Sequence, residues 1–192
     1  AFPGLAQMAP DGKNILLDYE LDGANGQQML FSSCSQVNAV QDEAVTPHQF
    51  KLLRLLRINC RAAELYLNSA PSSRSFFPQT LTASFASELP AQAVPDRGGD
   101  SLDMRKGALM GRYEKDLRID TIDGNHLSVT LTDGDKITYV ILARVDVDGD
   151  HKEDWIMRLD WSSPDSFGDG LDLIVLSKPS KEEGFIIHWR YK

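Results

Sequence analysis

The sequence predicts an α+β fold: an antiparallel β-meander of about six strands in the C-terminal half, with an N-terminal hairpin and one long helix packed on it. Three observations predict this fold class. Two strand-like runs open the chain, the strongest helical periodicity follows in residues 46–70, and residues 104–192 consist of apolar runs of strand length joined by short turns. Strands that are segregated from helices along the chain are typical of α+β proteins.

The N-terminal half predicts a hairpin followed by the long helix. Two strand-like runs flank the turn-rich residues 22–26, which is typical of a β-hairpin. We expect Thr46 to cap the helix, with Pro47 at its first position and Gln49 completing a capping box. Pro71 ends the helix. At 100° per residue the apolar positions form one broad arc, made of Leu52, Leu53, Leu56, Cys60, Ala63 and Leu67.

We expect a single domain. A short helix follows Pro78, because Leu81, Phe85 and Leu89 stand at helical spacing. Each half of the chain alone would hold under about 100 residues, and the long helix needs an apolar surface to cover. The parts of this domain, 1–192, are the hairpin plus helical part in 1–89, a loop in 90–103, and the antiparallel sheet in 104–192.

The second half predicts the sheet strand by strand. Leu127, Val129 and Leu131 alternate with polar residues, which indicates a strand with one solvated face. Trp155 and Trp161 share a strand face with apolar neighbours, which favours the core over a carbohydrate-stacking platform. The strand-like runs are residues 127–132, 137–145, 155–161, 171–176 and 185–191. The run 137–145 is apolar on both faces and predicts a central strand.

The composition is that of an ordinary globular protein. The chain has 192 residues, of which 42% are hydrophobic and 25% charged, and a formal net charge of −8. These values exclude a disordered or coiled-coil protein, and no apolar run approaches the roughly 18 residues that a membrane-spanning helix requires. Because the acidic balance lacks a Lys/Arg-rich patch, we expect no nucleic acid and no anionic lipid surface as a partner.

A nine-residue loop between two predicted strands concentrates acidic residues. Asp146, Asp148, Asp150 and Asp154 occupy loop positions 1, 3, 5 and 9, and Lys152 at position 7 offers a backbone carbonyl. Calcium takes six to eight oxygen ligands, and carboxylates this close together repel one another without a counter-ion. The spacing therefore predicts a Ca²⁺ site with a structural role. The alternative is an acidic hairpin turn that binds no ion.

The same loop carries a resemblance to a known local motif. The segment from Asp146 to Trp155, which follows apolar residues 141–143 and precedes Ile156, resembles the calcium loop of FG-GAP and VCBS repeats. These repeats occur in extracellular integrin-like propellers and in many secreted bacterial proteins. The resemblance implies that the four aspartates are side-chain ligands and that Gly149 permits the sharp turn. His151 departs from the family pattern, which usually has glycine there, and no second copy of the motif indicates a propeller.

Cys34 and Cys60 are the only two cysteines. A disulfide between them would close a loop of about 25 residues, contribute about 3–4 kcal/mol to stability and require an oxidising compartment. The alternative is two buried free thiols in a cytosolic protein. The chain begins at Ala1 without an initiating Met, as a processed or trimmed chain does. This start and the acidic loop favour the disulfide and a periplasmic or secreted location.

The sequence contains no hydrolase elbow, phosphate-binding loop, zinc-protease helix or dinucleotide fingerprint. It therefore favours an exported, non-enzymatic calcium-binding protein that acts as a binding or interaction module, such as a periplasmic inhibitor or an immunity-type protein. Its partner would be a protein or a cell-envelope component. The competing hypothesis is a small secreted hydrolase that uses an acidic pair, or Cys34 with His48, His126 or His188 as its base.

Overall fold

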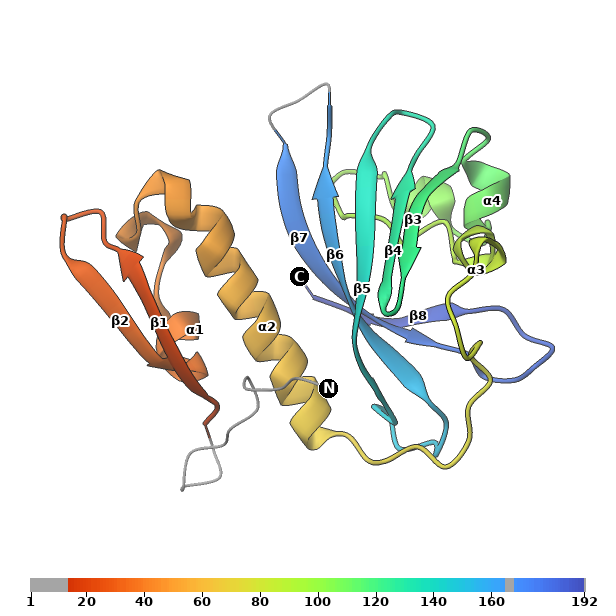
Figure 1. Cartoon of the computed structure of the whole chain (residues 1–192), viewed down its shortest axis with the longest axis horizontal. Helices are drawn as coiled ribbons and strands as arrows, with labels where there is room; N and C mark the ends of the chain where they lie inside the picture. Colours follow the sequence, from red (N-terminus) through yellow and green to blue (C-terminus); the bar gives the residue numbers. More distant parts are fainter. Residues whose placement is uncertain (1–13, 165–167, 192) are drawn as a thin grey trace. The chain divides into compact units, whose positions relative to one another are not determined.

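The computed structural model describes residues 14–164 and 168–191 (Figure 1). They fall into two compact units, which are separated between Asn68 and Ser69. The predicted fold class is confirmed, with a two-stranded hairpin, a six-stranded antiparallel sheet in the C-terminal half and one long helix. The boundary between the units precedes the predicted 90–103 loop, and the grouping of both units in one domain stays a prediction. The chain start at Ala1 lies outside the described residues.

The first unit contains the hairpin and the long helix. Figure 1 shows the hairpin and α1 on the same side of α2. Leu21 and Phe31 of the hairpin share one buried core with Leu53 and Leu56 of α2. The predicted apolar arc of the helix thus packs on the hairpin except at Leu52, which is 36% exposed. The elements are β1 (Leu16–Asp22), β2 (Gln28–Ser33), α1 (Cys34–Ala39), the 3₁₀ helices η1 (Asp42–Ala44) and η2 (Pro47–Gln49), and α2 (Phe50–Asn68).

The start of the long helix differs from the predicted capping box. Thr46 precedes η2, but its side chain makes no capping hydrogen bond. The Gln49 side chain instead accepts a hydrogen bond from the Asp22 backbone N–H at 2.6 Å and donates one to the Asp22 carboxylate at 2.6 Å. A contact with the hairpin, which local spacing does not reveal, therefore replaces the reciprocal cap.

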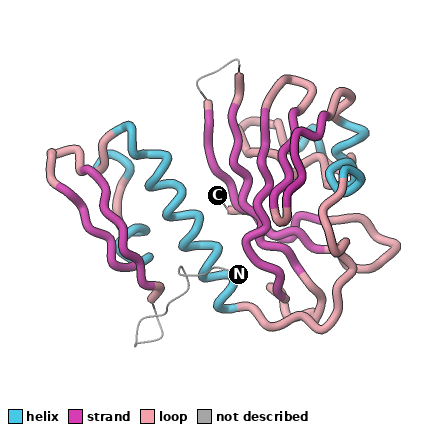
Figure 2. Tube along the Cα trace, viewed as in Figure 1, coloured by secondary structure: helices cyan, strands magenta, loops and turns pink. Residues whose placement is uncertain are grey.

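The second unit is built on the meander. Its strands pair antiparallel in the order β3-β4-β5-β6-β7-β8, so β5 and β6 are the two central strands. Figure 2 shows much of the segment between α2 and α3 as loop. The elements are α3 (Ala83–Glu88), the 3₁₀ helix η3 (Asp103–Arg105), α4 (Met110–Tyr113), β3 (Arg118–Asp123), β4 (His126–Thr130), β5 (Lys136–Val145), β6 (Asp154–Ser162), β7 (Asp169–Ser177) and β8 (Ile186–Arg190).

One face of this sheet forms the larger core together with α3 and the segment before it. Trp155 is fully buried, and its ring lies 4.3 Å from that of Phe77 and 5.2 Å from that of Phe85 between centroids. Trp161 is partly buried against the same core. Gly170 lies so close to the Trp161 indole that a Cβ there would approach it to 2.7 Å. Both tryptophans thus lie on the core face, as their strand parity predicts.

Candidate metal centre

The connection between the two central strands brings three carboxylates together. β5 ends at Val145 and β6 begins at Asp154, and these two residues form the last pair of the ladder. The two ends of the loop are therefore adjacent. Carboxylate oxygens of Asp146, Asp148 and Asp154 all lie within 4.8 Å of one another. This cluster, called the acidic triad below, could hold a metal ion.

Backbone N–H groups of the loop hold two members of the acidic triad in place. The two carboxylate oxygens of Asp146 accept hydrogen bonds from Gly149 N at 2.7 Å and from His151 N at 2.8 Å. Asp154 accepts one from Val147 N at 2.9 Å. These bonds turn the loop around the side chains, and each oxygen retains a lone pair for a further partner.

The turn requires two residues with left-handed backbone conformation. Gly149 has a φ of 82° and His151 a φ of 68°. Glycine adopts this region without a steric penalty, whereas a residue with a Cβ does so at a cost. His151 thus adopts a backbone conformation that glycine favours.

Two members of the acidic triad are buried, and no Lys or Arg in the described part of the chain forms an ion pair with them. The Asp146 side chain is 0% exposed and that of Asp148 is 30% exposed, while Asp154 is buried. Within the described part of the chain, the ion-pair partners of the acidic triad are two imidazoles, His151 Nδ1 at 3.9 Å from Asp146 and His188 Nδ1 at 3.7 Å from Asp148. The Lys152 ammonium is paired with Asp150 and also interacts electrostatically with Asp148. Burying carboxylates without a strong counter-charge is unfavourable. A bound cation or a proton therefore stabilises the site.

Burial raises the pKa of the Asp154 carboxyl. The Ser177 hydroxyl and the Val147 N–H oppose the rise because they stabilise the charged form. The nearby charge of Asp148 adds to the rise, and His188 opposes it. Desolvation thus prevails over the hydrogen bonds at this buried carboxyl.

Ser177 places a further oxygen beside the acidic triad. It pairs with Asp154 across the β6–β7 ladder and is 7% exposed. Its Oγ is close enough to lower the pKa of Asp154, but it forms no hydrogen bond with that carboxylate. Among the described residues it is the only buried side-chain oxygen or nitrogen without a hydrogen-bond partner. Sequence reasoning missed it, and the one available signal is a hydroxyl directly after the apolar run of residues 173–176. A buried hydroxyl with free lone pairs suits a cation or an ordered water.

The segment after α2 clamps the loop from outside. Ala70 and Asp146 exchange two backbone hydrogen bonds of 2.9 Å, and Ser73 donates to the His151 carbonyl through both N and Oγ. Glu153 N donates to the Arg74 carbonyl at 2.8 Å. These bonds hold both ends of the loop on a third backbone segment. Local spacing gave no indication of them.

The other two predicted ligands lie differently. The Asp150 carboxylate accepts hydrogen bonds from Lys152 N at 2.8 Å and Lys152 Nζ at 2.7 Å, and it is not a member of the acidic triad. These hydrogen bonds lower the pKa of Asp150 and raise that of Lys152. The ligand roles of Asp150 and of the Lys152 carbonyl stay predictions.

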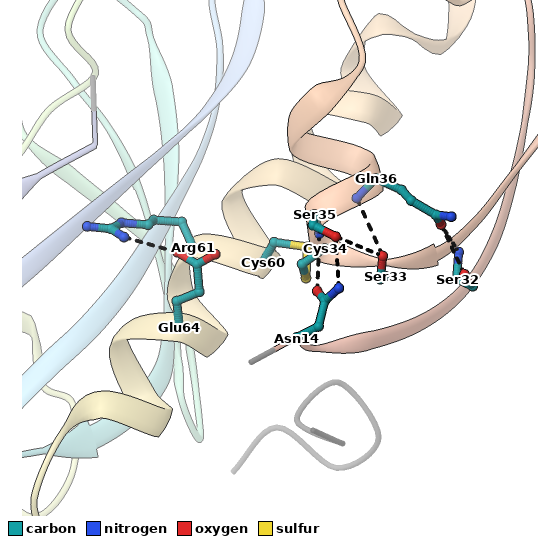
Figure 3. The surroundings of a disulfide bond; sticks show 9 residues. All are labelled: Asn14, Ser32, Ser33, Cys34, Ser35, Gln36, Cys60, Arg61 and Glu64. Carbon is teal, nitrogen blue, oxygen red and sulfur yellow. Dashed lines mark hydrogen bonds and ion pairs between the residues drawn. A yellow bond between two sulfur atoms is a disulfide. The ribbon is translucent and has the colours of Figure 1, made fainter. Parts of the chain in front are cut away.

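The two cysteines form the predicted disulfide in the first unit. Cys34 and Cys60 are bonded, with their Cα atoms 5.5 Å apart, and both are buried. Figure 3 shows the bond beside the start of α1, where the Ser33 side chain accepts a hydrogen bond from Gln36 N. The bridge ties α1 to α2. Since the sulfur of Cys34 is bonded to Cys60, it offers no thiolate for nucleophilic catalysis.

The acidic triad is the only group of three or more possible metal-ligating side chains that lie this close together within residues 14–164 and 168–191. None of the helices described is long and apolar enough to cross a membrane. Comparison of the chain with protein-family models, with curated proteins and with solved structures finds no match.

Proposed function

We propose that the protein is an exported, non-enzymatic calcium-binding protein that acts as a binding or interaction module. The acidic triad carries the calcium part of this proposal. Two of its carboxylates are buried, and no Lys or Arg in the described part of the chain forms an ion pair with them. A bound cation removes both the repulsion between the carboxylates and the cost of their burial.

The chemistry of the site favours Ca²⁺ among the common cations. Carboxylate and hydroxyl oxygens suit the hard ions Ca²⁺, Mg²⁺ and Mn²⁺, whereas zinc and copper prefer nitrogen and sulfur. Ca²⁺ accepts six to eight oxygens in flexible geometry, while Mg²⁺ requires a near-ideal octahedron. Besides the acidic triad, the loop offers Asp150 and backbone carbonyls, and the end of β7 offers Ser177 Oγ. We expect a dissociation constant of about 10⁻⁴–10⁻³ M and a structural role.

Calcium-dependent stability tests the proposal directly. We expect the melting temperature of the full chain in EDTA to rise on addition of Ca²⁺ to 10 mM, with a smaller rise for Mg²⁺. Calcium at 10 to 100 times the dissociation constant stabilises the protein by about 1.4–2.7 kcal/mol. For a chain of this size this corresponds to a shift of about 3–10 °C. Calorimetry or circular dichroism measures the shift.

Matched variants assign the response to the acidic triad. Asp148→Asn should lose it, whereas Asp116→Asn, which removes the same charge from an exposed residue elsewhere in the unit, should keep it. Asp150→Asn tests whether Asp150 is a ligand, as its spacing predicts. The calcium-induced shift should shrink if Asp150 binds the ion, and should stay unchanged if the carboxylate only pairs with Lys152. The calcium proposal is wrong if millimolar Ca²⁺ causes no shift, or if Asp148→Asn responds like the unmodified chain.

The disulfide supports export, because such bonds form and persist in oxidising compartments. We propose a periplasmic or secreted location and a protein or cell-envelope component as the partner. Chain isolated from its native host should show no free thiol when denatured without reductant, and two free thiols would contradict export. The hydrolase hypothesis loses Cys34 as its nucleophile, and no feature of the site favours an acidic pair.

A further inference from the structure

The second unit contains a cavity of about 310 Å³. Three segments line it: residues 76–78, residues 82–88 around α3, and residues 178–185 of the β7–β8 connection. Pockets that hold small molecules begin at about 300 Å³. The cavity is therefore large enough for a ligand with one or two rings, and it is separate from the acidic triad in its lining residues.

The floor of the cavity is aromatic and rigid. Phe77, Phe85 and Phe185 are buried, and the ring of Phe185 lies 5.4 Å from that of Phe77 and 5.1 Å from that of Phe85. Phe77 in turn stacks on the fully buried Trp155. Because the rings are locked into the main core, the floor is already formed before a ligand arrives, which lowers the entropic cost of binding.

The rim of the cavity is positively charged. Lys178 and Lys181 line it together with a single acid, Glu88. Lys178 Nζ lies 4.4 Å from the centroid of the Phe185 ring, so the aromatic floor holds this ammonium at the cavity. None of the ion pairs of the described residues involves either lysine. Glu182 and Glu183 of the same connection do not line the cavity, so the lining carries an excess of one positive charge, which complements an anion.

We propose that this cavity binds a small organic anion. Its flat or short aliphatic body lies on the phenylalanine floor, and its carboxylate or sulfonate pairs with Lys178 and Lys181. The hydroxyls of Thr82 and Ser84, which also line the cavity and lie 2.8 Å apart, supply hydrogen bonds at the same rim. The site is independent of calcium, and its ligand class follows from an apolar floor combined with a cationic edge.

Titration with 2-naphthoate tests the proposal on the full chain. We expect saturable binding with a stoichiometry of one and a dissociation constant of about 0.1–1 mM, typical of a ligand of this size. The neutral 2-naphthamide should bind about tenfold more weakly. Calorimetry measures affinity, and amide chemical-shift changes should concentrate in residues 76–88 and 178–185.

Charge and shape variants locate the site. Lys178→Met and Lys181→Met keep an apolar stem and should each weaken naphthoate binding about three- to tenfold. Lys115→Met, which alters an exposed lysine outside the cavity, should leave binding unchanged. Ser84→Trp, which fills the cavity from an exposed position on α3, should abolish binding without lowering the melting temperature.

Several results would overturn the proposal. Equal affinity for naphthoate and naphthamide would show that the lysines do not select an anion. Absence of saturable binding at 5 mM, or unchanged binding in both lysine variants, would show that the cavity is not the site. Light scattering tests whether a second copy of the chain occupies the cavity instead. A dimer that dissociates in Ser84→Trp would assign the cavity to self-association and overturn the proposal.

Discussion

The two compact units are stabilised in different ways. The first has a core of ten buried residues within the described chain, and that core contains a disulfide. The second has a core of twenty buried residues, built from the sheet, α3 and a cluster of aromatic rings. A small unit buries too little apolar surface for much stability, and a covalent link compensates by restricting its unfolded state. The larger unit needs no such link, and its costly feature is the desolvated acidic triad.

Loss of the disulfide should have the largest effect. Replacing Cys34 and Cys60 together by alanine should destabilise the first unit by about 3–4 kcal/mol, because the unfolded chain regains the entropy of its closed loop. Hydrogen exchange should show lost protection in α2 and the hairpin, with protection in β5 and β6 retained. Equal loss of protection in both units would instead show that they unfold as one cooperative domain, as the sequence predicts.

Glu114 tests how the second unit holds a buried charge. Burial alone would raise the pKa of this carboxyl, but hydrogen bonds from Thr132 N, at 3.0 Å, and from Arg105, at 2.5 Å, outweigh it and lower the pKa below the ordinary glutamate value of 4.5. Its stabilising contribution is thus complete above pH 4.5 and is lost as the pH falls through the folded-state pKa. We expect Glu114→Gln to cost about 2 kcal/mol at pH 7.

Urea unfolding at several pH values measures this contribution. The difference between Glu114→Gln and the unmodified chain should shrink as the pH falls below 4.5. A difference that is the same at pH 7 and pH 3 would mean that the carboxylate charge contributes nothing. The disulfide of the first unit does not titrate in this range, so its contribution provides a reference that is independent of pH.

Ser177→Ala should affect stability mainly when calcium is present. In EDTA the variant should stay within about 1 kcal/mol of the unmodified chain, because removal of a buried hydroxyl without a hydrogen-bond partner offsets the loss of its stabilising effect on the Asp154 carboxylate. In 10 mM Ca²⁺ the calcium-induced shift of the melting temperature should be smaller than in the unmodified chain. A loss of stability in EDTA, with an unchanged calcium shift, would make Ser177 a purely structural residue.

His151→Gly should have the smallest effect, and it should be stabilising. The backbone at this position is left-handed, with a φ of 68°. Glycine relieves that strain but increases the entropy of the unfolded chain, so we expect a net gain of less than about 1 kcal/mol. His151→Ala is the matched control, because it keeps the Cβ and should give no gain. Denaturant unfolding of the two variants, with EDTA present, makes the comparison.

Much of the fold was predictable because burial repeats with the period of the local structure. The 3.6-residue period marked α2, alternation marked β4 and β6, and a run apolar on both faces marked β5 as a central strand. The clustering of Asp146, Asp148 and Asp154 was also visible, because all three lie in or at the end of one short hairpin connection and are therefore close in sequence. With only two cysteines in the chain, a disulfide could join only Cys34 and Cys60.

The tertiary structure alone decided which groups complete these features. Ser177 reaches the acidic triad from the next strand, Ala70 clamps the loop from a distant segment, and Gln49 bonds to Asp22 of the hairpin in place of its predicted cap. The aromatic floor and the two lysines of the cavity likewise come from segments far apart in the chain. Contacts of this kind leave no periodic trace in the sequence, because they depend on how elements pack and not on the spacing of residues within one of them.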